Sequence, residues 1–369
     1  MKILHMTNTL DLDGTGINNV LVDLCLEQAS HGHDVSVVSW SSDNQLIQDL
    51  AGRGISMRTI PAWRNIAGLG ATARQLRRLE VFREADVIHV HTVRAYGSLL
   101  ASFMPRIWYR SVSTLHNPFQ RSTLLLLTAR KPVSVSQKHA QLLTQQFGPA
   151  GKRVGTVLNR VVGTKRLAPF TQVRPRKLTG EQRFLYVGGL LERKGIETLV
   201  QIMEHIVPKH PGAHLYIVGN RDNPSFERRV AGSPAAAHIH LEGFAADPRE
   251  YMVACDVFVF PSHVEAFGLV LTEARNCGMA VLASDIDGIP EAMDMGEAGI
   301  LLPPKDVARW VTVLDELCTN PEELKKLRER ALRGIDAFAV GTMATEYQKL
   351  YESLPAQRRT YARWFSRVG

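Results

Sequence analysis

The chain has 369 residues, 45% of them hydrophobic and 22% charged, with a net charge of +8. Its length exceeds what one ordinary core needs and predicts two domains of roughly 150–200 residues each. We find neither a low-complexity tract nor the roughly 20 consecutive apolar residues of a membrane span, and the first apolar run, Lys2–Met6, is too short for a signal peptide. We therefore expect a cytoplasmic protein, peripheral at most at the inner face of the cytoplasmic membrane.

In the first half, short apolar strands alternate with helical segments. Lys2–Thr7 predicts a strand, a Gly-containing loop follows, and Ile17–Ala29 has the apolar spacing of a helix. Further strands are predicted at Asp34–Trp40, Asp86–His91 and Arg110–Leu115. Such alternation is typical of a parallel sheet covered by helices on both faces.

The positive charge is concentrated in one span. Residues 87–180 contain no Asp or Glu but 15 Lys and Arg, so the rest of the chain is net acidic. A generic surface rich in arginine is one interpretation. We favour an anionic partner, such as a membrane leaflet or a lipid-phosphate acceptor, because a long acid-free span offers a positive face. A nucleic-acid partner is not favoured, since aromatic residues are not interleaved with this basic run.

The second half repeats the alternation. Strands are predicted at Phe184–Val187, Leu215–Val218, His238–Leu241, Val257–Phe260 and Ala280–Ala283, and C-terminal helices at Leu324–Leu332 and Thr342–Leu354. The stretch Leu167–Gly180, with two prolines, is predicted to be a linker. We divide the chain into 1–168, a linker 169–181, 182–341, and a C-terminal part, 342–369, that packs back on the first domain. The four cysteines, Cys25, Cys255, Cys277 and Cys318, are interpreted as buried thiols.

Two βα loops of the second half carry the residues that indicate chemistry. In one, a strand ends in Gly188-Gly189 and Arg193-Lys194 precede a helix, a combination that suits a diphosphate. In the other, Phe260 ends a strand and a helix is expected to begin near Gly268, with Glu265 before it and Glu273 within it. A helix N-terminus favours an anion, and carboxylates accept hydrogen bonds from sugar hydroxyls. Alone, each loop also fits an ordinary charged connection.

Together the loops resemble the donor domain of the retaining glycosyltransferases of the glycogen-synthase-like family 4, also called group 1. The resemblance rests on the glycine-rich turn with Arg193-Lys194 and on Glu265 and Glu273 separated by seven residues. It covers Phe184 to about Val313 with high specificity and includes Asp285–Glu291. It implies an α/β fold in which two Rossmann-like domains face a cleft, the GT-B arrangement.

The first half resembles the family more loosely. The segments that carry this part are Asp86–His91, Ser113–Asn117, Val133–Ser136 and Val157–Asn159. The first loop departs from the family pattern, because Gly14-Thr15-Gly16 stands where paired glycines are usual. A second departure is Asp287-Gly288 before Ile-Pro-Glu.

The resemblance implies a role for each site residue. Arg193 and Lys194 would bind the diphosphate and stabilise the leaving group, and Glu273 would hold the ribose. The transferred sugar would be contacted by Glu265, by His116 from the other domain, and by backbone N–H groups of Phe267, Gly268 and Leu269. Gly14, Gly16 and Gly189 are candidate substrate contacts. The family works without a metal ion, so we expect no cofactor besides the nucleotide-sugar donor.

Other patterns compete with this hypothesis. His89 and His91 are interpreted as a strand end at the cleft and not as a metal pair, on the assumption that their side chains point to opposite faces of the strand. Gly14-x-Gly16 followed by Asn19 does not complete a dinucleotide fingerprint. The segment Gln357–Arg367, in which arginines alternate with aromatics, fits a membrane anchor or a helix packed on the first domain.

We predict a retaining hexosyltransferase that uses a nucleotide-diphosphate sugar and a lipid-linked or cell-surface glycan acceptor, of lipopolysaccharide, capsule or exopolysaccharide type. Two alternatives on the same fold are a nucleotide-sugar 2-epimerase and a catalytically silent nucleotide-sugar-binding protein. The epimerases lack the combination of Arg-Lys with the spaced glutamates, and the presence of the whole donor set disfavours a silent protein.

Overall fold

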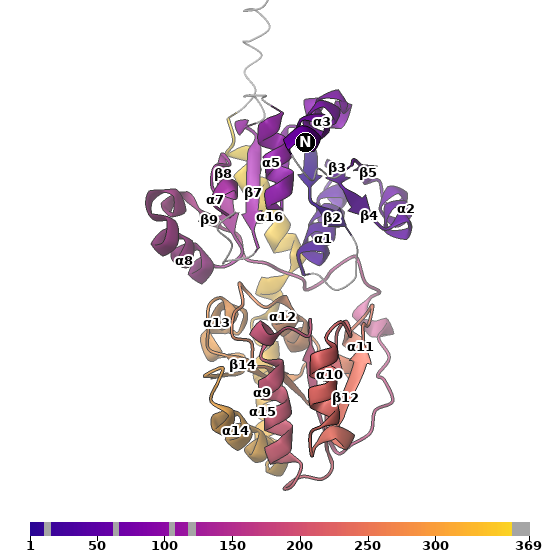
Figure 1. Ribbon diagram of the computed structural model, residues 1–369, viewed down its shortest axis with the longest axis vertical. Coiled ribbons are helices and arrows are strands. Elements are labelled where there is room, and N and C mark those ends of the chain that lie inside the picture. The colour runs from indigo at the N-terminus through magenta and orange to yellow at the C-terminus, as the bar shows by residue number, and fades with distance from the viewer. Residues whose placement is uncertain (11–15, 62–65, 103–107, 117–122, 356–369) are drawn as a thin grey trace, which may run out of the picture.

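The computed structural model describes residues 1–10, 16–61, 66–102, 108–116 and 123–355. Within these ranges the chain forms two halves, each built on its own parallel sheet (Figure 1). Gly14, the triplet 11–13 and the basic segment Gln357–Arg367 lie outside the described residues. No helix in the described ranges has the length and apolar character needed to cross a membrane.

The first sheet has the strand order β5-β3-β1-β6-β7-β8-β9. Its strands are short and largely buried because helices cover both faces, which explains the apolar runs in the sequence. The strands are β1 (Lys2–Met6), β3 (Asp34–Ser39), β5 (Ser56–Thr59), β6 (Val87–Val90), β7 (Ser111–Leu115), β8 (Lys131–Ser134) and β9 (Gly155–Thr156). Two short strands, β2 (Thr9–Leu10) and β4 (Ser41–Ser42), pair beside it.

The helices of the first half follow the strands in alternation. They are α1 (Gly16–Ser30), α2 (Asn44–Gly52), α3 (Ile66–Arg78), α4 (Glu80–Glu84), α5 (Val93–Ala101), α7 (Thr123–Leu126) and α8 (Gln137–Phe147). Ser136 caps α8 by accepting a hydrogen bond from the backbone N–H of His139 (3.1 Å).

The second sheet has the order β12-β11-β10-β13-β14-β15, so the chain starts in the middle, moves to one edge and then returns to the other. This is the Rossmann order, and ligands bind where the direction reverses, here between β10 and β13. The strands are β10 (Gln182–Val187), β11 (Ala213–Val218), β12 (Ile239–Gly243), β13 (Val257–Phe260), β14 (Ala280–Ser284) and β15 (Ile300–Leu302). The first sheet reverses in the same way between β1 and β6.

The helices of the second half are α9 (Ile196–Ile206), α10 (Pro224–Ala231), α11 (Arg249–Met252), α12 (Leu269–Asn276), α13 (Ile289–Ala292), α14 (Val307–Thr319) and α15 (Pro321–Leu332). The predicted strands and helices of both halves are present, with ends that differ by a few residues. The two α/β halves, each with a doubly wound parallel sheet, agree with the fold predicted from the sequence.

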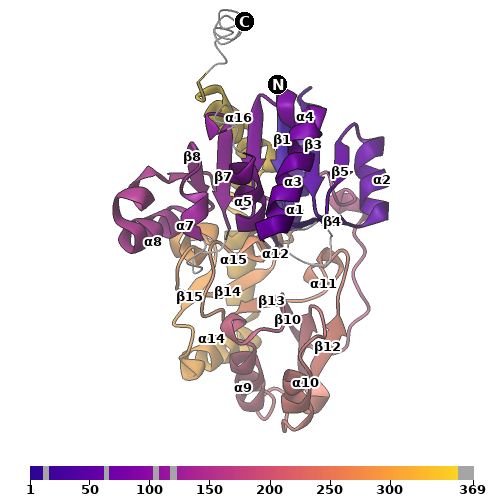
Figure 2. The same cartoon turned by 45° about the horizontal axis from the view of Figure 1, so that its top comes forward.

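The last described helix, α16 (Val340–Glu352), belongs in space to the first half. Its buried face, including Met343, Tyr347 and Tyr351, packs against the core beneath β1, β6 and α1. The chain therefore crosses between the halves twice, and the two crossings touch where Val162 pairs with Ala339. Figure 1 shows α16 running beside the first sheet, and Figure 2 shows the two halves meeting near α12.

Contacts across the junction join the N-terminus of α8 to the second half. The backbone N–H groups of Gln137 and Lys138 donate to the two carboxylate oxygens of Glu291, at 2.8 and 2.7 Å. The hydroxyl of Ser136 donates to the carbonyl of Ala266 (2.7 Å). Glu291 thus completes the cap of a helix in the other half, and the charge favours the helix N-terminus.

Two predictions about single residues need revision. Cys25 and Cys255 are buried as predicted, but Cys277 and Cys318 are only partly buried; all four are free thiols.

Several basic side chains of the acid-free span, residues 87–180, point inward. Arg110 is 5% exposed and donates to the carbonyl of Ala85, and Arg160 forms a two-pronged ion pair with Glu346. The positive surface is accordingly smaller than the sequence indicates.

Candidate active site

A cavity of about 500 Å³ opens between the halves at the carboxyl ends of both sheets. This is the edge where doubly wound sheets bind ligands. Its first-half wall includes Gly16, Ile17, Asn19, His116, Asn159, Arg166 and Leu167. Its second-half wall includes Gly188, Gly189, Arg193, Lys194, Glu265, Phe267, Gly268, Leu269 and Glu273. Every candidate site residue that the structure describes therefore lines this one cavity.

The loop after β10 brings the two cations to the cavity. Arg193 and Lys194 lie in a single 3-10 turn (Glu192–Lys194), which ends at Gly195 in the left-handed conformation, with φ of +72°. A Cβ at Gly195 would lie 1.9 Å from the carbonyl oxygen of Pro261. Only glycine allows this approach, in which the loop after β10 packs tightly against the loop after β13. The backbone N–H of His263 donates to the carbonyl of Arg193 (2.8 Å) and holds the two loops together.

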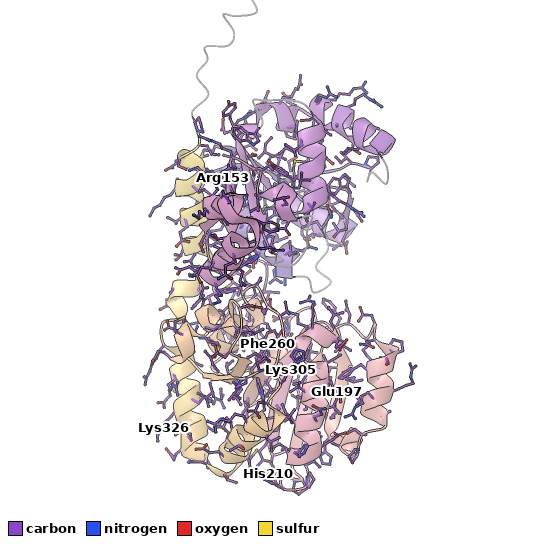
Figure 3. All side chains as sticks on the ribbon, turned by 60° about the vertical axis from the view of Figure 1, so that its left-hand side comes forward. Arg153, Glu197, His210, Phe260, Lys305 and Lys326 are labelled. Carbon is purple, nitrogen blue, oxygen red and sulfur yellow. The ribbon has the colours of Figure 1, made fainter. Side chains whose placement is uncertain are left out.

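The loop after β13 brings Glu265 and the start of α12 to the same place. Gly268, with φ of +91°, turns the chain into α12, whose first N–H groups lack intrahelical partners. Glu265 forms an ion pair with the ammonium of Lys194, and both side chains are about 15% exposed. The Lys194 ammonium also lies 5.4 Å above the centre of the Phe260 ring. In Figure 3, Phe260 lies close to the junction of the halves, while His210 lies at the far end of the second half.

A third loop supports Glu265 from behind. The backbone N–H of Glu265 donates to the carboxylate of Asp287 (3.1 Å), and the N–H of Gly288 donates to the carbonyl of Glu265 (3.3 Å). A Cβ at Gly288 would lie 2.0 Å from the carbonyl oxygen of Ala266. The close approach explains why a glycine precedes the Ile-Pro-Glu segment.

Glu273 faces the cavity from the first turns of α12. Burial raises the pKa of its carboxyl above the usual 4.5, although the positive charges of Arg166 and Arg249 lower it in part. A desolvated carboxylate with open acceptor positions suits hydroxyl ligands, because it gains from each hydrogen bond that it accepts.

His116 follows β7 on the opposite wall and is 9% exposed. Burial, with a smaller contribution from the nearby His139, lowers the pKa of its imidazole to about 3. The ring is thus neutral at physiological pH, and its Nε2 lies 3.3 Å from Nδ1 of His91. The structure places His116 across the cavity from the loops that follow β10 and β13.

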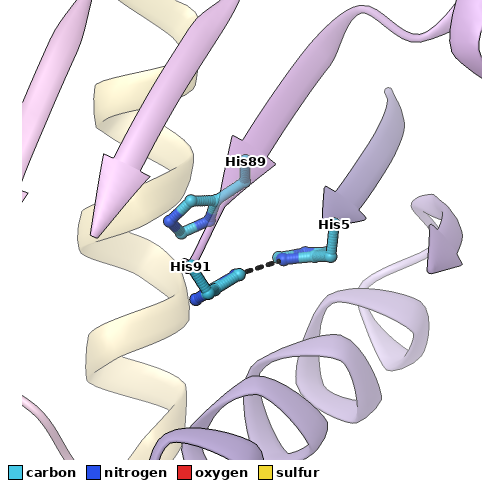
Figure 4. A group of neighbouring side chains, drawn as sticks. All are labelled: His5, His89 and His91. Atoms are coloured by element: carbon cyan, nitrogen blue, oxygen red, sulfur yellow. Dashed lines mark hydrogen bonds between the residues drawn. The ribbon is translucent and has the colours of Figure 1, made fainter. Parts of the chain in front are cut away.

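The prediction that His89 and His91 point to opposite faces of their strand is wrong. Residues i and i+2 of a strand point the same way, and the two ring centres are 4.2 Å apart. His5, the Cα partner of His89 on β1, joins them (Figure 4). One ligand atom from each of His5, His89 and His91 lies within 4.8 Å of the others, a spacing that could hold a metal ion.

Two Asp-x-Asp triplets, a spacing that can bind a metal ion, occur in the chain, so the expectation of a metal-free site rests on the family resemblance alone. One, at 11–13, lies outside the described residues. In the other, Asp285 is exposed, while Asp287 holds the backbone of Glu265. The carboxylate of Asp287 therefore already accepts a hydrogen bond from the protein backbone.

Sequence reasoning missed three polar residues of the first-half wall: Asn19, Asn159 and Arg166. The side-chain oxygens of Asn19 and Asn159 are buried without a hydrogen-bond partner in the described part of the chain. Arg166 forms an ion pair with the buried carboxylate of Asp23 (3.3 Å). Asn19 lies in the first turn of α1 and Asn159 lies just beyond β9. Both positions follow the carboxyl end of a strand, which is the signal that could have flagged them.

Two family models match the chain. "Glycosyltransferase Family 4" matches residues 14–161, and "Glycosyl transferases group 1" matches residues 170–333. The two matches correspond to the two halves and together cover most of the sequence.

Individual proteins support the same relationship. Over 362 residues the chain is 25% identical to the phosphatidyl-myo-inositol mannosyltransferase of Mycolicibacterium smegmatis, covering 94% of this chain and 92% of that protein. It is 30% identical over 216 residues to the glycogen synthase of Mycobacterium tuberculosis, covering 55% of this chain but only half of that enzyme. The crystal structure of Anabaena HepE in complex with UDP and glucose has a TM-score of 0.80 at 18% identity and covers 95% of this chain and 99% of that one.

These matches agree with the fold and with the cavity between two Rossmann-like halves. The chain belongs to the group 1 glycosyltransferases of family 4 and is a glycosyltransferase with the GT-B fold.

Proposed function

We propose that the protein transfers a hexose-type sugar, with retention of anomeric configuration, from a nucleoside-diphosphate sugar to a lipid-linked or cell-surface glycan. The observation that carries the proposal is the meeting of Lys194, Glu265 and the start of α12 on one wall of the cavity. HepE, which shares the fold, binds UDP and glucose, and a nucleoside diphosphate is the matching ligand proposed for this cavity.

The donor would lie along the second-half wall. Arg193 and Lys194 are the cations for its diphosphate, and the N-terminus of α12 adds the positive end of the helix dipole. Glu273, deeper in the cavity, would accept hydrogen bonds from the ribose hydroxyls. Lys194 is already paired with Glu265, so an incoming diphosphate must share the ammonium with that carboxylate.

The transferred sugar would lie between the halves, with Glu265 and the backbone N–H groups of Phe267, Gly268 and Leu269 on one side and His116 on the other. When the bond between the anomeric carbon and the diphosphate breaks, negative charge develops on the leaving oxygen. Fixed cations and a helix dipole aimed at that oxygen stabilise the transition state more than the ground state. These cations can carry the role of a metal ion, and we propose turnover that persists in the presence of a chelator.

The acceptor is inferred from two lines of support. The relative from Mycolicibacterium smegmatis is named for transfer of mannose to phosphatidyl-myo-inositol, a lipid. On the first half, the partly buried Trp108 and the exposed Tyr109 and Arg130 gather at the amino ends of β7 and β8. The rings of Trp108 and Tyr109 meet edge to face with their centres 5.0 Å apart, and the guanidinium of Arg130 lies 5.7 Å from the Trp108 ring centre. Such a surface suits an anionic membrane interface.

Paired substitutions test the donor site. Lys194→Ala is expected to lower kcat by about 10²–10³-fold, the usual effect of removing one group that stabilises the leaving oxygen. Glu273→Ala is expected to raise the KM for the donor mainly. Lys209→Ala, a surface lysine paired with Asp315 and remote from the cavity, is the matched control. Normal kinetics in both cavity variants would refute the donor site.

A sedimentation assay with vesicles containing anionic lipid tests the membrane surface. Exchanging Arg130 and Arg153 for glutamine is expected to weaken binding, with a larger effect at low salt because exposed charges are screened. Arg174 and Lys177, exposed bases in the linker, give the matched control. Equal binding by both double variants would remove the membrane surface from the proposal and leave the transferase reaction untouched.

A further inference from the structure

Behind His116 lies a buried cluster of imidazole rings that the proposed reaction does not use. His5 lies in β1, His89 lies in β6 and His91 directly follows β6. The three rings are at most 3% exposed. Their centres are 4.2–5.3 Å apart, and the ring of His91 lies 5.6 Å from that of His116. Figure 4 shows His5 and His91 facing each other across the strands.

The rings form a continuous chain of hydrogen bonds that starts at His116. Its Nε2 lies 3.3 Å from Nδ1 of His91, and Nε2 of His91 lies 3.0 Å from Nδ1 of His5. The chain ends at α1, where Nε2 of His5 lies 2.8 Å from the side-chain oxygen of Gln28.

The amide of Gln28 gives this chain a direction. An amide oxygen can only accept, so Nε2 of His5 must carry the hydrogen, and in a neutral ring Nδ1 is then an acceptor. It follows that His91 donates to His5 through Nε2, and that His116 donates to His91 through Nε2. Burial lowers the pKa of His5 to about 4 and of His116 to about 3, so each ring carries a single hydrogen at neutral pH.

A second arm holds the amide of Gln28 in place. Its nitrogen donates to the hydroxyl of Tyr351 on α16 (3.2 Å), and this hydroxyl lies 2.7 Å from Nδ1 of His89. His89 reaches Thr114 through Nε2 (2.7 Å). The pattern is self-consistent when Tyr351 donates to His89 and His89 donates to Thr114. Reversal of the amide would reverse both arms, so the orientation of this one group determines every tautomer.

We propose that Gln28 is a positioning residue which, through His5 and His91, holds His116 as the Nε2–H tautomer and leaves the Nδ1 lone pair to accept a hydrogen bond from a hydroxyl in the cavity. Among the described residues, Nδ1 of His116 has no hydrogen-bond partner, while the residue lines the cavity. The identity of that hydroxyl as one on the transferred sugar rests on the proposed function. The predicted tautomer of His116 does not depend on the proposed function.

The same contacts favour a hydrogen-bond chain over a metal centre. Each of the six ring nitrogens of His5, His89 and His91 already has a partner: His91 and Gln28 for His5, Tyr351 and Thr114 for His89, and His5 and His116 for His91. An ion would have to replace bonds that are already made in a fully buried site. A buried polar network whose groups are all satisfied makes the site rigid.

Nitrogen-15 NMR of the full chain, labelled only at histidine, reports which ring nitrogen carries the hydrogen. Comparison with His116→Asn assigns the His116 signals. The expected wild-type result is a single Nε2–H tautomer for His116. In Gln28→Met, which removes the terminal acceptor, the Nδ1–H form of His116 is expected to become populated. Gln28→Glu, which keeps an acceptor for His5, should retain the wild-type tautomer and serves if the methionine variant does not fold. Thr114→Val alters only the other arm and is the matched control.

Wild-type His116 in the Nδ1–H form, or one Zn²⁺ bound per chain with shifts of the His5, His89 and His91 signals, would overturn the proposal. With a donor in hand, Gln28→Met should lower kcat/KM by about 5-fold, the usual effect of one neutral hydrogen bond, while Thr114→Val stays near wild type. If the expected tautomers are found but no nucleotide-sugar is turned over, the positioning role of Gln28 is supported and the proposed function fails.

Discussion

Gly195 is the position at which a small change should disturb the site most. It joins the 3-10 turn that carries Arg193 and Lys194 to α9, in a left-handed conformation with φ of +72°. The substitution Gly195→Ala adds one methyl group. That carbon would lie 1.9 Å from the carbonyl oxygen of Pro261, and carbon atoms of this kind are essentially never closer than 3.0 Å to another residue's heavy atoms. The two loops must therefore separate by about 1 Å.

Two costs add up. The left-handed conformation costs an alanine about 1–2 kcal/mol relative to glycine, and forcing an extra methyl group into a packed contact costs about 1–3 kcal/mol more. The separation of the loops moves Lys194 away from Glu265 and from the proposed position of the diphosphate. A displacement of about 1 Å in a positioned catalytic group costs roughly 10²-fold in rate.

Gly278→Ala is the matched control, because Gly278 has nearly the same φ (+70°) but its nearest neighbour would be 3.8 Å away. Urea unfolding should show a loss of about 1–2 kcal/mol for Gly278→Ala and a larger loss for Gly195→Ala. The rate of nucleotide release from the donor should fall about 10²-fold in Gly195→Ala and stay unchanged in Gly278→Ala. Equal stability and equal turnover in the two variants would refute the reasoning.

Three further outcomes are expected. Glu291→Gln weakens the cap that Glu291 provides to α8 across the junction, so small-angle scattering should detect a more open molecule, whereas the exposed control Glu297→Gln should leave the profile unchanged. His5 and His116 have lowered pKa values, of about 4 and 3, so the unfolded chain binds more protons below pH 6.5; the free energy of unfolding should fall by about 1–2 kcal/mol per histidine between pH 6.5 and 5, and a flat profile would contradict their burial. Glu273 has a raised pKa, so the stability of wild type relative to Glu273→Gln should decline as pH rises above about 4.5, and the opposite trend would contradict its desolvation.

Much of the fold and of the cavity's second-half wall could be predicted because local signals agree with one another. A strand that ends in glycines and is followed by cations, as at Gly188 to Lys194, has few possible places in a parallel sheet: the carboxyl edge. The same holds for Glu265 and Glu273 around the start of α12. These residues converge because both loops follow central strands, which the alternation of strands and helices already implies.

The first-half wall was harder to predict because it depends on pairing between distant segments. His5 meets His89 only through the register of β1 and β6, 84 residues apart, and Gln28 meets Tyr351 only because the C-terminal helix returns to the first half. No local pattern carries that information. The error about His89 and His91 was one of strand geometry and could have been avoided from the sequence.

The charge pattern predicted the positive surface only in part, for a similar reason. A count of bases in residues 87–180 does not distinguish an exposed arginine from one that satisfies the interior. Arg110 donates to a buried carbonyl, and Arg160 pairs with Glu346 on α16, so each serves the packing of the fold. Arg130, Lys152 and Arg153 are exposed and remain as bases for an anionic partner.

The central claim, that the cavity binds a nucleoside-diphosphate sugar and transfers its sugar, is tested most directly with a panel of nucleotide-sugars. Each donor would be assayed by thermal shift and by release of free nucleotide, with and without a bacterial lipid or glycan extract. The account predicts that one donor stabilises the protein and releases nucleotide substantially only with the extract, and that Lys194→Ala abolishes the release. Stabilisation by no donor, or conversion of a donor to its epimer without any acceptor, would contradict it.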